Sequence, residues 1–115
     1  MSPAGSCVFC KIAAGEIPAT VVKRADGMLA FKDLSPQAPT HLLVIPTTHV
    51  SSLNDARDAA SLGNLPACAR DVAQETGMAT KGYRVVLNTN PDGGQTVFHL
   101  HLHVLGGRPM HWPPG

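Results

Sequence analysis

Three histidines alternate with aliphatic residues near the end of the chain, at His99, His101 and His103. Successive side chains of a β-strand point to opposite faces. A strand over residues 97–105 therefore places the three imidazoles on one face and leaves an aliphatic face that can be buried, made of Leu100, Leu102 and Val104. Neutral imidazole is a nucleophile, a proton carrier and a metal ligand. The pattern thus predicts either phosphate or acyl chemistry or a metal site.

A catalytic metal is the first alternative for this row. A His-x-His pair on a strand can ligate zinc, iron or copper, but a two-histidine site of this kind is completed by a carboxylate. No Asp or Glu follows Asp92 in the chain. The missing carboxylate disfavours a catalytic metal at the histidine row.

Phosphoryl or nucleotidyl transfer fits the row better. A histidine that attacks phosphorus needs donors for the charged oxygens and a partner that holds its own tautomer. His101, at the centre, is the predicted nucleophile, and a main-chain carbonyl near His99 can fix its tautomer. The loop at residues 89–96 has paired glycines, which let backbone N–H groups approach a phosphate closely. The predicted phosphate donors are therefore His103 and the backbone of Gly94, Gln95 and Thr96.

Five strands and two helices are expected to position these residues. Hydrophobic periodicity and turn residues predict strands over residues 20–24, 28–32, 41–46, 83–88 and 97–105. They also predict a short helix over residues 8–14 and a long one from residue 54 or 55 to 76. Pro66 lies within the long helical pattern, where it predicts a kink or the start of a new helix. His41 and His49 share the face of the row if the strand at 41–46 lies beside the last strand.

Length and charge limit the classes of function. A chain of 115 residues fits a single domain, residues 1–115, with residues 1–6 as a flexible N-terminus and 106–115 as a tail. The formal net charge is +1 and the basic residues are scattered, which predicts no nucleic-acid or membrane partner. The sequence has neither an apolar run of the ~20 residues that a membrane span needs nor a signal-peptide pattern. We expect a cytoplasmic protein.

Two of the three cysteines, Cys7 and Cys10, have Cys-x-x-Cys spacing. In a reducing compartment this spacing indicates metal ligands or ordinary thiols more than a disulfide. The third, Cys68, lies in the long helical pattern and is predicted to be a core residue.

The histidine row and its flanks resemble the histidine triad (HIT) superfamily, in particular its Hint branch of nucleoside phosphoramidases. The resemblance covers nearly the whole chain. Its motifs are the row itself, residues 92–96 before it, residues 105–115 after it, and further matches at Phe9, 11–12, 16–18, 30–31, 33–41, 45–46 and 82–84. Thr96 departs from the serine that often ends the glycine loop in this branch, but it keeps the hydroxyl.

The resemblance implies an α+β fold, with a five-stranded antiparallel sheet, one long helix and one short helix. It also implies a homodimer, in which the long helix and a strand of each subunit pair and the two sheets form one continuous ten-stranded sheet. In that arrangement the tail with Trp112 approaches the partner's active site.

The implied reaction is hydrolysis of the P–N bond of purine nucleoside 5′-phosphoramidates, with no cofactor required. His101 attacks the α-phosphorus and forms a nucleotidyl-histidine, which water resolves to AMP or GMP. The implied nucleoside contacts are Phe9, Ile12, Asp33 and Leu34, the implied phosphate or leaving-group contacts are Asn88, Gly94, Gln95, Thr96 and His103, and the supporting residues are His41, His99 and Trp112.

Other functions stay open. The chain could be a nucleotide-sensing or protein-interaction module, or a dinucleoside polyphosphate hydrolase that shares the nucleophile.

A structural metal is a separate question. Some triad proteins carry a structural zinc, and two thiolates with two imidazoles suit a tetrahedral zinc site. The ligands here would be Cys7, Cys10, His49 and His99, although free thiols are an equally simple reading.

Overall fold

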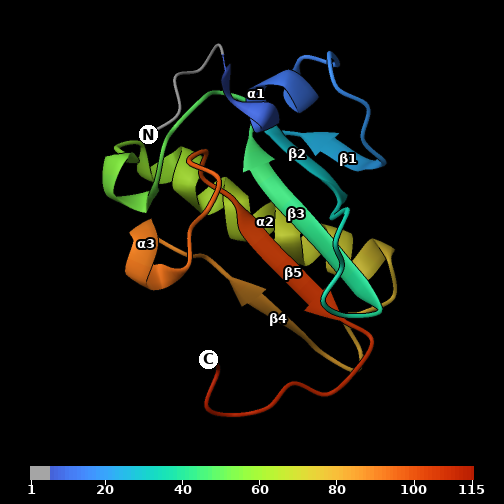
Figure 1. Cartoon of the computed structure of the whole chain (residues 1–115). Helices are drawn as coiled ribbons and strands as arrows, with labels where there is room; N and C mark the ends of the chain where they lie inside the picture. Colours follow the sequence, from blue (N-terminus) through green and yellow to red (C-terminus); the bar gives the residue numbers. More distant parts are fainter. Residues whose placement is uncertain (1–5) are drawn as a thin grey trace.

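The computed structural model describes residues 6–115 and contains one antiparallel sheet in the order β1-β2-β3-β5-β4 (Figure 1). The strands are β1 (Val21–Ala25), β2 (Met28–Lys32), β3 (Thr40–Pro46), β4 (Tyr83–Val86) and β5 (Leu102–Gly106). The helical elements are α1 (Val8–Ala13), the 3₁₀ turn η2 (Leu53–Asp55), α2 (Ala59–Glu75) and α3 (Asn90–Gly93). The predicted α+β fold with five antiparallel strands is confirmed. The single turn α3 was not predicted, and the expected flexible segment 1–6 lies outside the described residues except for Ser6.

The sheet separates two apolar clusters because its inner strands alternate between two covered faces. Alternate residues of β2, β3 and β5 pack against α2 on one face. The intervening residues of β2 and β3 pack against α1, which covers only part of the other face. Figure 1 shows α2 behind the sheet and α1 at one end of β2 and β3. The face of β3 and β5 beyond α1 is therefore left for the functional groups.

The β1–β2 hairpin closes as predicted. Asp26 and Gly27 have φ values of 56° and 74°, and two consecutive positive φ values are what a two-residue hairpin turn requires. Gly27 takes this conformation without a steric penalty.

The long helix differs from its prediction at both the start and the middle. Residues 53–55 form η2 instead, and α2 begins after Asp58, whose carboxylate accepts from the Ala60 N–H at 3.1 Å. Pro66 lies inside α2 and does not start a new helix. The helix continues through the lost backbone donor because burial of its apolar face against the sheet offsets the cost; that face comprises Leu65, Cys68, Ala69, Val72 and Ala73.

The last strand is shorter than predicted, because β5 begins at Leu102 and only His103 of the row lies within it. If the register continued two residues beyond Leu102, Leu100 would lie opposite Pro46, whose nitrogen has no hydrogen to donate. Leu100 N–H donates to the Val50 carbonyl instead, at 2.6 Å. The alternation of faces persists in the segment before β5, since Leu100 is buried with the α2 cluster.

Two glycines give opposite predictions for stability. Gly107 has a φ of +93°, and a Cβ there would meet Pro39 Cβ at 2.8 Å. Gly107→Ala should lower the free energy of unfolding by about 1–3 kcal/mol. Gly63 lies inside α2, where a Cβ would meet nothing within 4 Å, so Gly63→Ala should raise it by about 0.5–1 kcal/mol. Urea unfolding of both variants measures the two changes in the free energy of unfolding. A Gly107→Ala variant that is more stable than the wild type would contradict the predicted clash with Pro39.

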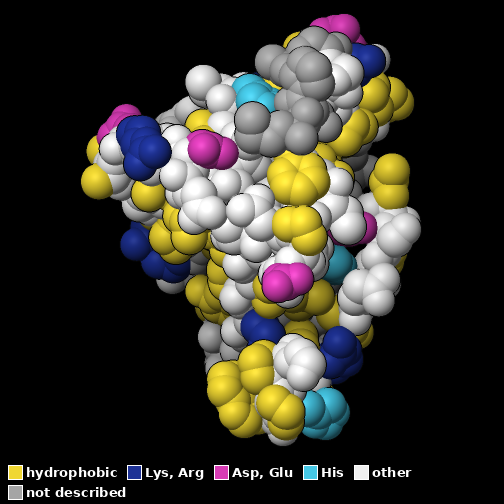
Figure 2. Space-filling model, turned by 60° about the vertical axis from the view of Figure 1, so that its left-hand side comes forward, with side chains coloured by type: hydrophobic (Ala, Val, Ile, Leu, Met, Phe, Trp, Pro, Cys, Tyr) yellow, Lys and Arg dark blue, Asp and Glu magenta, His cyan; other side chains and the backbone are white. Residues whose placement is uncertain are grey.

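Charge is dispersed over the surface. On the face in Figure 2, Lys and Arg side chains are interspersed with Asp and Glu and do not gather into one patch. Within the described residues, no helix is both long enough and apolar enough to cross a membrane.

Candidate active site

His101 is held in one tautomer by the main chain. Its ring is 7% exposed, and its Nδ1 lies 2.7 Å from the His99 carbonyl oxygen. A carbonyl only accepts, so Nδ1 carries the proton and donates it, which leaves the Nε2 lone pair unprotonated. The edge of the Phe9 ring packs against the imidazole, with centroids 5.2 Å apart. This is the arrangement that a nucleophilic imidazole needs.

A second chain of hydrogen bonds orients His103. The N–H of Gln37 donates to His41 Nδ1 at 3.0 Å, so a neutral His41 carries its proton on Nε2. That Nε2–H lies 2.9 Å from His103 Nδ1 and donates to it. A neutral His103 therefore has its own proton on Nε2, beside the His101 ring, with centroids 5.0 Å apart. The condition under which His41 shares the face of the row is met, because β3 and β5 are neighbours.

Burial disfavours the charged forms of His101 and His103 by lowering the pKa of each ring. Desolvation lowers the pKa of His101 below its ordinary 6.5, against opposing effects of the His99 carbonyl and the Asp33 carboxylate. Desolvation also lowers the pKa of His103 to about 4, with help from the neighbouring His101 and His41 rings. The neutral form is the one that attacks phosphorus or donates a single N–H, so both shifts favour the chemistry.

The four residues expected to hold the nucleoside lie around one cavity of about 250 Å³. Phe9 and Ile12 are buried on α1 at its inner wall, whereas Leu34 is 91% exposed at its rim. Asp33, directly after β2, supplies a carboxylate to the same cavity. Its mostly apolar lining suits a flat ring, and the single acid suits hydroxyl donors.

The loop before the histidine segment is held together by Gln95. This residue is 4% exposed, its side-chain amide donates to the carbonyls of Ser51 and Val97, and its side-chain carbonyl accepts from Asn90 N–H. The N–H groups of Gly94 and Gln95 also donate to carbonyls of α3. The Gln95 side chain therefore supports the loop, and contacts of Gly94 and Gln95 with a phosphate stay a prediction.

Two further polar residues of the predicted phosphate site, Thr96 in this loop and Asn88 just before it, have side chains without a hydrogen-bond partner in the described residues. Thr96 is exposed, and Asn88 is half-buried with its amide beside Gly94, where a Cβ would lie 3.9 Å from Asn88 Nδ2. No hydrogen bond of either side chain occurs within residues 6–115. The side-chain donors of Thr96 and Asn88 are therefore not used within the described residues, and their contacts with a phosphate stay a prediction.

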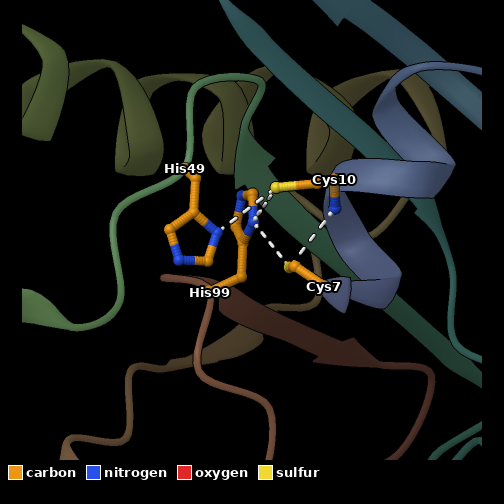
Figure 3. A group of neighbouring side chains, drawn as sticks. All are labelled: Cys7, Cys10, His49 and His99. Atoms are coloured by element: carbon orange, nitrogen blue, oxygen red, sulfur yellow. Dashed lines mark hydrogen bonds between the residues drawn. The ribbon is translucent and has the colours of Figure 1, made fainter. Parts of the chain in front are cut away.

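Two thiols and two imidazoles form a cluster that includes His99, the first histidine of the row (Figure 3). Cys7 Sγ lies 3.2 Å from His99 Nδ1, and Cys10 Sγ lies 3.2 Å from His49 Nδ1 and 3.5 Å from His99 Nδ1. A tetrahedral zinc ion with two sulfur and two nitrogen ligands would hold these atoms about 3.3–3.8 Å apart. The residues therefore fit a zinc ion with only small adjustments.

Two further features of the cluster suit a metal. His99 is fully buried, and its Nε2 lies 2.7 Å from the Pro46 carbonyl, so Nε2–H donates there and the Nδ1 lone pair faces the thiols. Burial is the main cause that raises the pKa of Cys10 to about 11, so a cation must displace its proton. His49 and His99 reach the cluster from the segments after β3 and before β5 (Figure 3).

Within the described part of the chain, hydrogen bonds hold the C-terminal tail at two places beyond β5, and one of these is Arg108, which donates to the Gln37 carbonyl at 2.9 Å. Arg84 donates to the His111 carbonyl at 2.8 Å, and the neighbouring Trp112 is 81% exposed. Within one subunit the Trp112 ring thus has little cover, and its approach to a partner's active site stays a prediction.

The sequence predicted a main-chain carbonyl near His99 for the tautomer of His101, and the His99 carbonyl takes that place. It did not reveal the two other main-chain groups that set ring tautomers, the N–H of Gln37 and the carbonyl of Pro46. Proline at position 46 was the one available signal, because it ends the ladder and frees a carbonyl beside the row.

A family model described as HIT domain matches residues 14–110. The purine nucleoside phosphoramidase of Escherichia coli (strain K12) is 46% identical over 105 residues, which cover 90% of this chain and 88% of that protein. A HIT family hydrolase from Legionella pneumophila Philadelphia 1 has a TM-score of 0.92 and 54% identity, covering 96% of this chain and 100% of that one. A zinc-bound histidine triad family protein from Mycobacterium smegmatis has a TM-score of 0.81 and 32% identity, covering 92% and 78%.

The matched residues include all five strands, α2 and the histidine row. The fold and the family model agree with the family that the sequence resembles. The chain belongs to the HIT domain family.

Proposed function

We propose that this protein hydrolyses the P–N bond of purine nucleoside 5′-phosphoramidates. The observation that carries the proposal is the fixed tautomer of His101, whose Nε2 lone pair is free next to the cavity lined by Phe9 and Asp33. The 46% identical purine nucleoside phosphoramidase of E. coli supports the same bond and the same class of base.

The proposed reaction has two steps. His101 Nε2 attacks the α-phosphorus, the P–N bond to the leaving group breaks, and the departing amine takes up one proton. Water then attacks the nucleotidyl-histidine, the bond from phosphorus to Nε2 breaks, and the nucleoside monophosphate leaves with release of one proton. Nε2–H of His103, with the side chains of Asn88 and Thr96, supplies donors to the phosphate or the leaving group.

The direct test measures release of AMP and GMP from adenosine and guanosine 5′-phosphoramidates. Denaturing the protein during turnover and mapping the modified peptide should place the nucleotidyl group on His101. Competition with a dinucleoside polyphosphate ranks that substrate against the phosphoramidate. Tight AMP binding without turnover of any of these compounds would instead identify a nucleotide-sensing module.

The pH profile follows from the lowered pKa of His101. Only the neutral ring attacks, and burial keeps the ring neutral below its ordinary pKa of 6.5. We expect kcat/KM to stay nearly constant from pH 8 to about 6.5 and to fall only as the pH drops through the lowered value. An acid limb centred above 6.5 would show that another group controls the rate.

We also propose a structural zinc ion, held by Cys7, Cys10, His49 and His99. Their separations and the second hydrogen bond of His99 support it, and so does the zinc-bound relative. When bound, the ion supplies four coordinate bonds that tie α1 to the segments flanking the site.

A homodimer with a continuous ten-stranded sheet is proposed as well. Support comes from β4, which is an edge strand of the sheet and carries the exposed Val85, since such an edge offers unpaired backbone groups to a second copy.

We propose a cytoplasmic location for the chain. None of the three cysteines, all within the described residues, forms a disulfide, as is usual for proteins of a reducing compartment.

A further inference from the structure

Asp33 and His41 belong to two parts of the site at once. Asp33 lines the nucleoside cavity, yet its Oδ2 also lies 3.5 Å from His41 Nε2. His41 is the residue whose Nε2–H fixes the tautomer of His103. A carboxylate that is expected to hold the ribose therefore stands next to the proton that orients the phosphate donor.

The loop between them is wrapped around His41. The N–H of Asp33 donates to the His41 carbonyl at 3.0 Å, and the N–H of Gln37 donates to its Nδ1 at 3.0 Å. Asp33 Oδ1 is held by the N–H of Ser35 at 2.7 Å. These bonds leave Oδ2 as the oxygen that can turn either to a ligand or to His41.

His41 has one Nε2 proton and two neighbouring acceptors. The distance to His103 Nδ1, 2.9 Å, is that of a hydrogen bond, whereas Asp33 Oδ2 at 3.5 Å is just too far. A carboxylate shift of about 0.6 Å would bring Oδ2 to normal hydrogen-bond length. The anion would then compete with the neutral His103 nitrogen, and hydrogen bonds to charged acceptors are the stronger ones. His103 would lose the contact that selects its tautomer.

We propose that the ribose hydroxyls, acting through Asp33 and His41, determine which nitrogen of His103 carries the proton that is donated to the phosphate. Hydroxyls that donate to Asp33 occupy its lone pairs and weaken it as an acceptor for His41. The His41 proton then stays on His103 Nδ1, and His103 presents Nε2–H to the α-phosphate. Asp33 and His41 are positioning residues in this scheme, which makes the ribose a determinant of kcat and not only of binding. The scheme rests on the proposed function for its substrate.

The kinetic test compares an adenosine 5′-phosphoramidate with its 2′,3′-dideoxy analogue in the wild type and in Asp33→Ala. In the wild type, the dideoxy substrate should lose about tenfold in kcat, since a hydrogen bond to a charged group is worth roughly that factor, in addition to any rise in KM. Asp33→Ala removes the competing carboxylate, so it should turn over the dideoxy substrate several-fold faster than the wild type does. An Asp33 that only binds ribose would leave the dideoxy kcat unchanged, and that result overturns the proposal.

Asp71→Asn is the matched control, because Asp71 pairs with Arg70 on the exposed side of α2. It should leave both substrates at wild-type rates. Thermal unfolding of each variant separates a folding defect from a kinetic effect.

The second measurement needs no turnover and no variant. Ring ¹⁵N spectra of the wild type at saturating AMP should show His103 as one tautomer, with Nε2 protonated, whereas 2′,3′-dideoxy-AMP should give mixed tautomers. Identical His103 spectra in the two complexes overturn the proposal. Absence of phosphoramidate turnover with distinct spectra would refute the proposed function and leave the coupling standing.

Discussion

Replacing His101 with alanine should reduce turnover of an adenosine 5′-phosphoramidate by at least about 10⁴-fold, because removal of a covalent nucleophile commonly costs that much or more. AMP should still bind within a few-fold of the wild-type affinity, since the nucleoside cavity is lined by other residues. Single-turnover kinetics and calorimetric titration with AMP measure the two quantities. A loss confined to KM would mean that His101 only binds the substrate.

Imidazole added to His101→Ala provides the matched control. The substitution leaves a gap beside Phe9 and His103, whose rings contact the native imidazole. Free imidazole that enters this gap can attack phosphorus and restore part of the turnover. A variant that melts like the wild type, yet keeps a rate within tenfold of it without imidazole, would refute the assignment of the nucleophile.

The features that the sequence predicted correctly are those with a short-range signal. Alternation of histidines with aliphatic residues has a period of two, so it survives even where the ladder ends and Leu100 leaves the β5 pairing. Asp26 and Gly27 encode their turn locally. The grouping of Cys7, Cys10, His49 and His99 came from the family resemblance, because no local pattern links α1 to residue 99.

What the sequence did not reveal has a long-range cause. The Gln95 side-chain amide donates to the carbonyl of Ser51, 44 residues away, so the side chain is buried in the protein. The tautomer of His99 depends on the Pro46 carbonyl, 53 residues away, which only the fold brings to its ring. Residue types alone carry no information on which carbonyl will face which ring nitrogen.

His99 links the thiol cluster to the nucleophile through its side chain and its backbone. His99 directs its Nδ1 to the thiols and its Nε2–H to Pro46, while its own carbonyl accepts from His101. Its side chain therefore belongs to the thiol cluster and its backbone to the nucleophile. A rigid His99 gives His101 a fixed acceptor, which is why the stability of the cluster bears on the active site.

Removal of the proposed zinc ion should destabilise the fold by several kcal/mol. A ligand present at about 1,000 times its Kd stabilises a protein by roughly 4 kcal/mol, which for a domain of this size shifts Tm by on the order of 10–20 °C. Protein purified without chelators should contain one zinc ion per chain. Its Tm should fall by that amount after treatment with a strong chelator and recover when zinc is added back.

Cysteine variants locate the effect. Cys10→Ser should lose the metal and the chelator-sensitive part of Tm, because a serine hydroxyl is a poor ligand where zinc prefers thiolate. Cys68→Ser is the matched control: this buried free thiol belongs to the apolar face of α2 and lies outside the thiol–imidazole cluster. Its melting point should drop modestly through the polar substitution, but zinc content and the response to chelator should remain. Metal-free wild type that melts at the same temperature as the purified protein would show that the cluster is held by its hydrogen bonds alone.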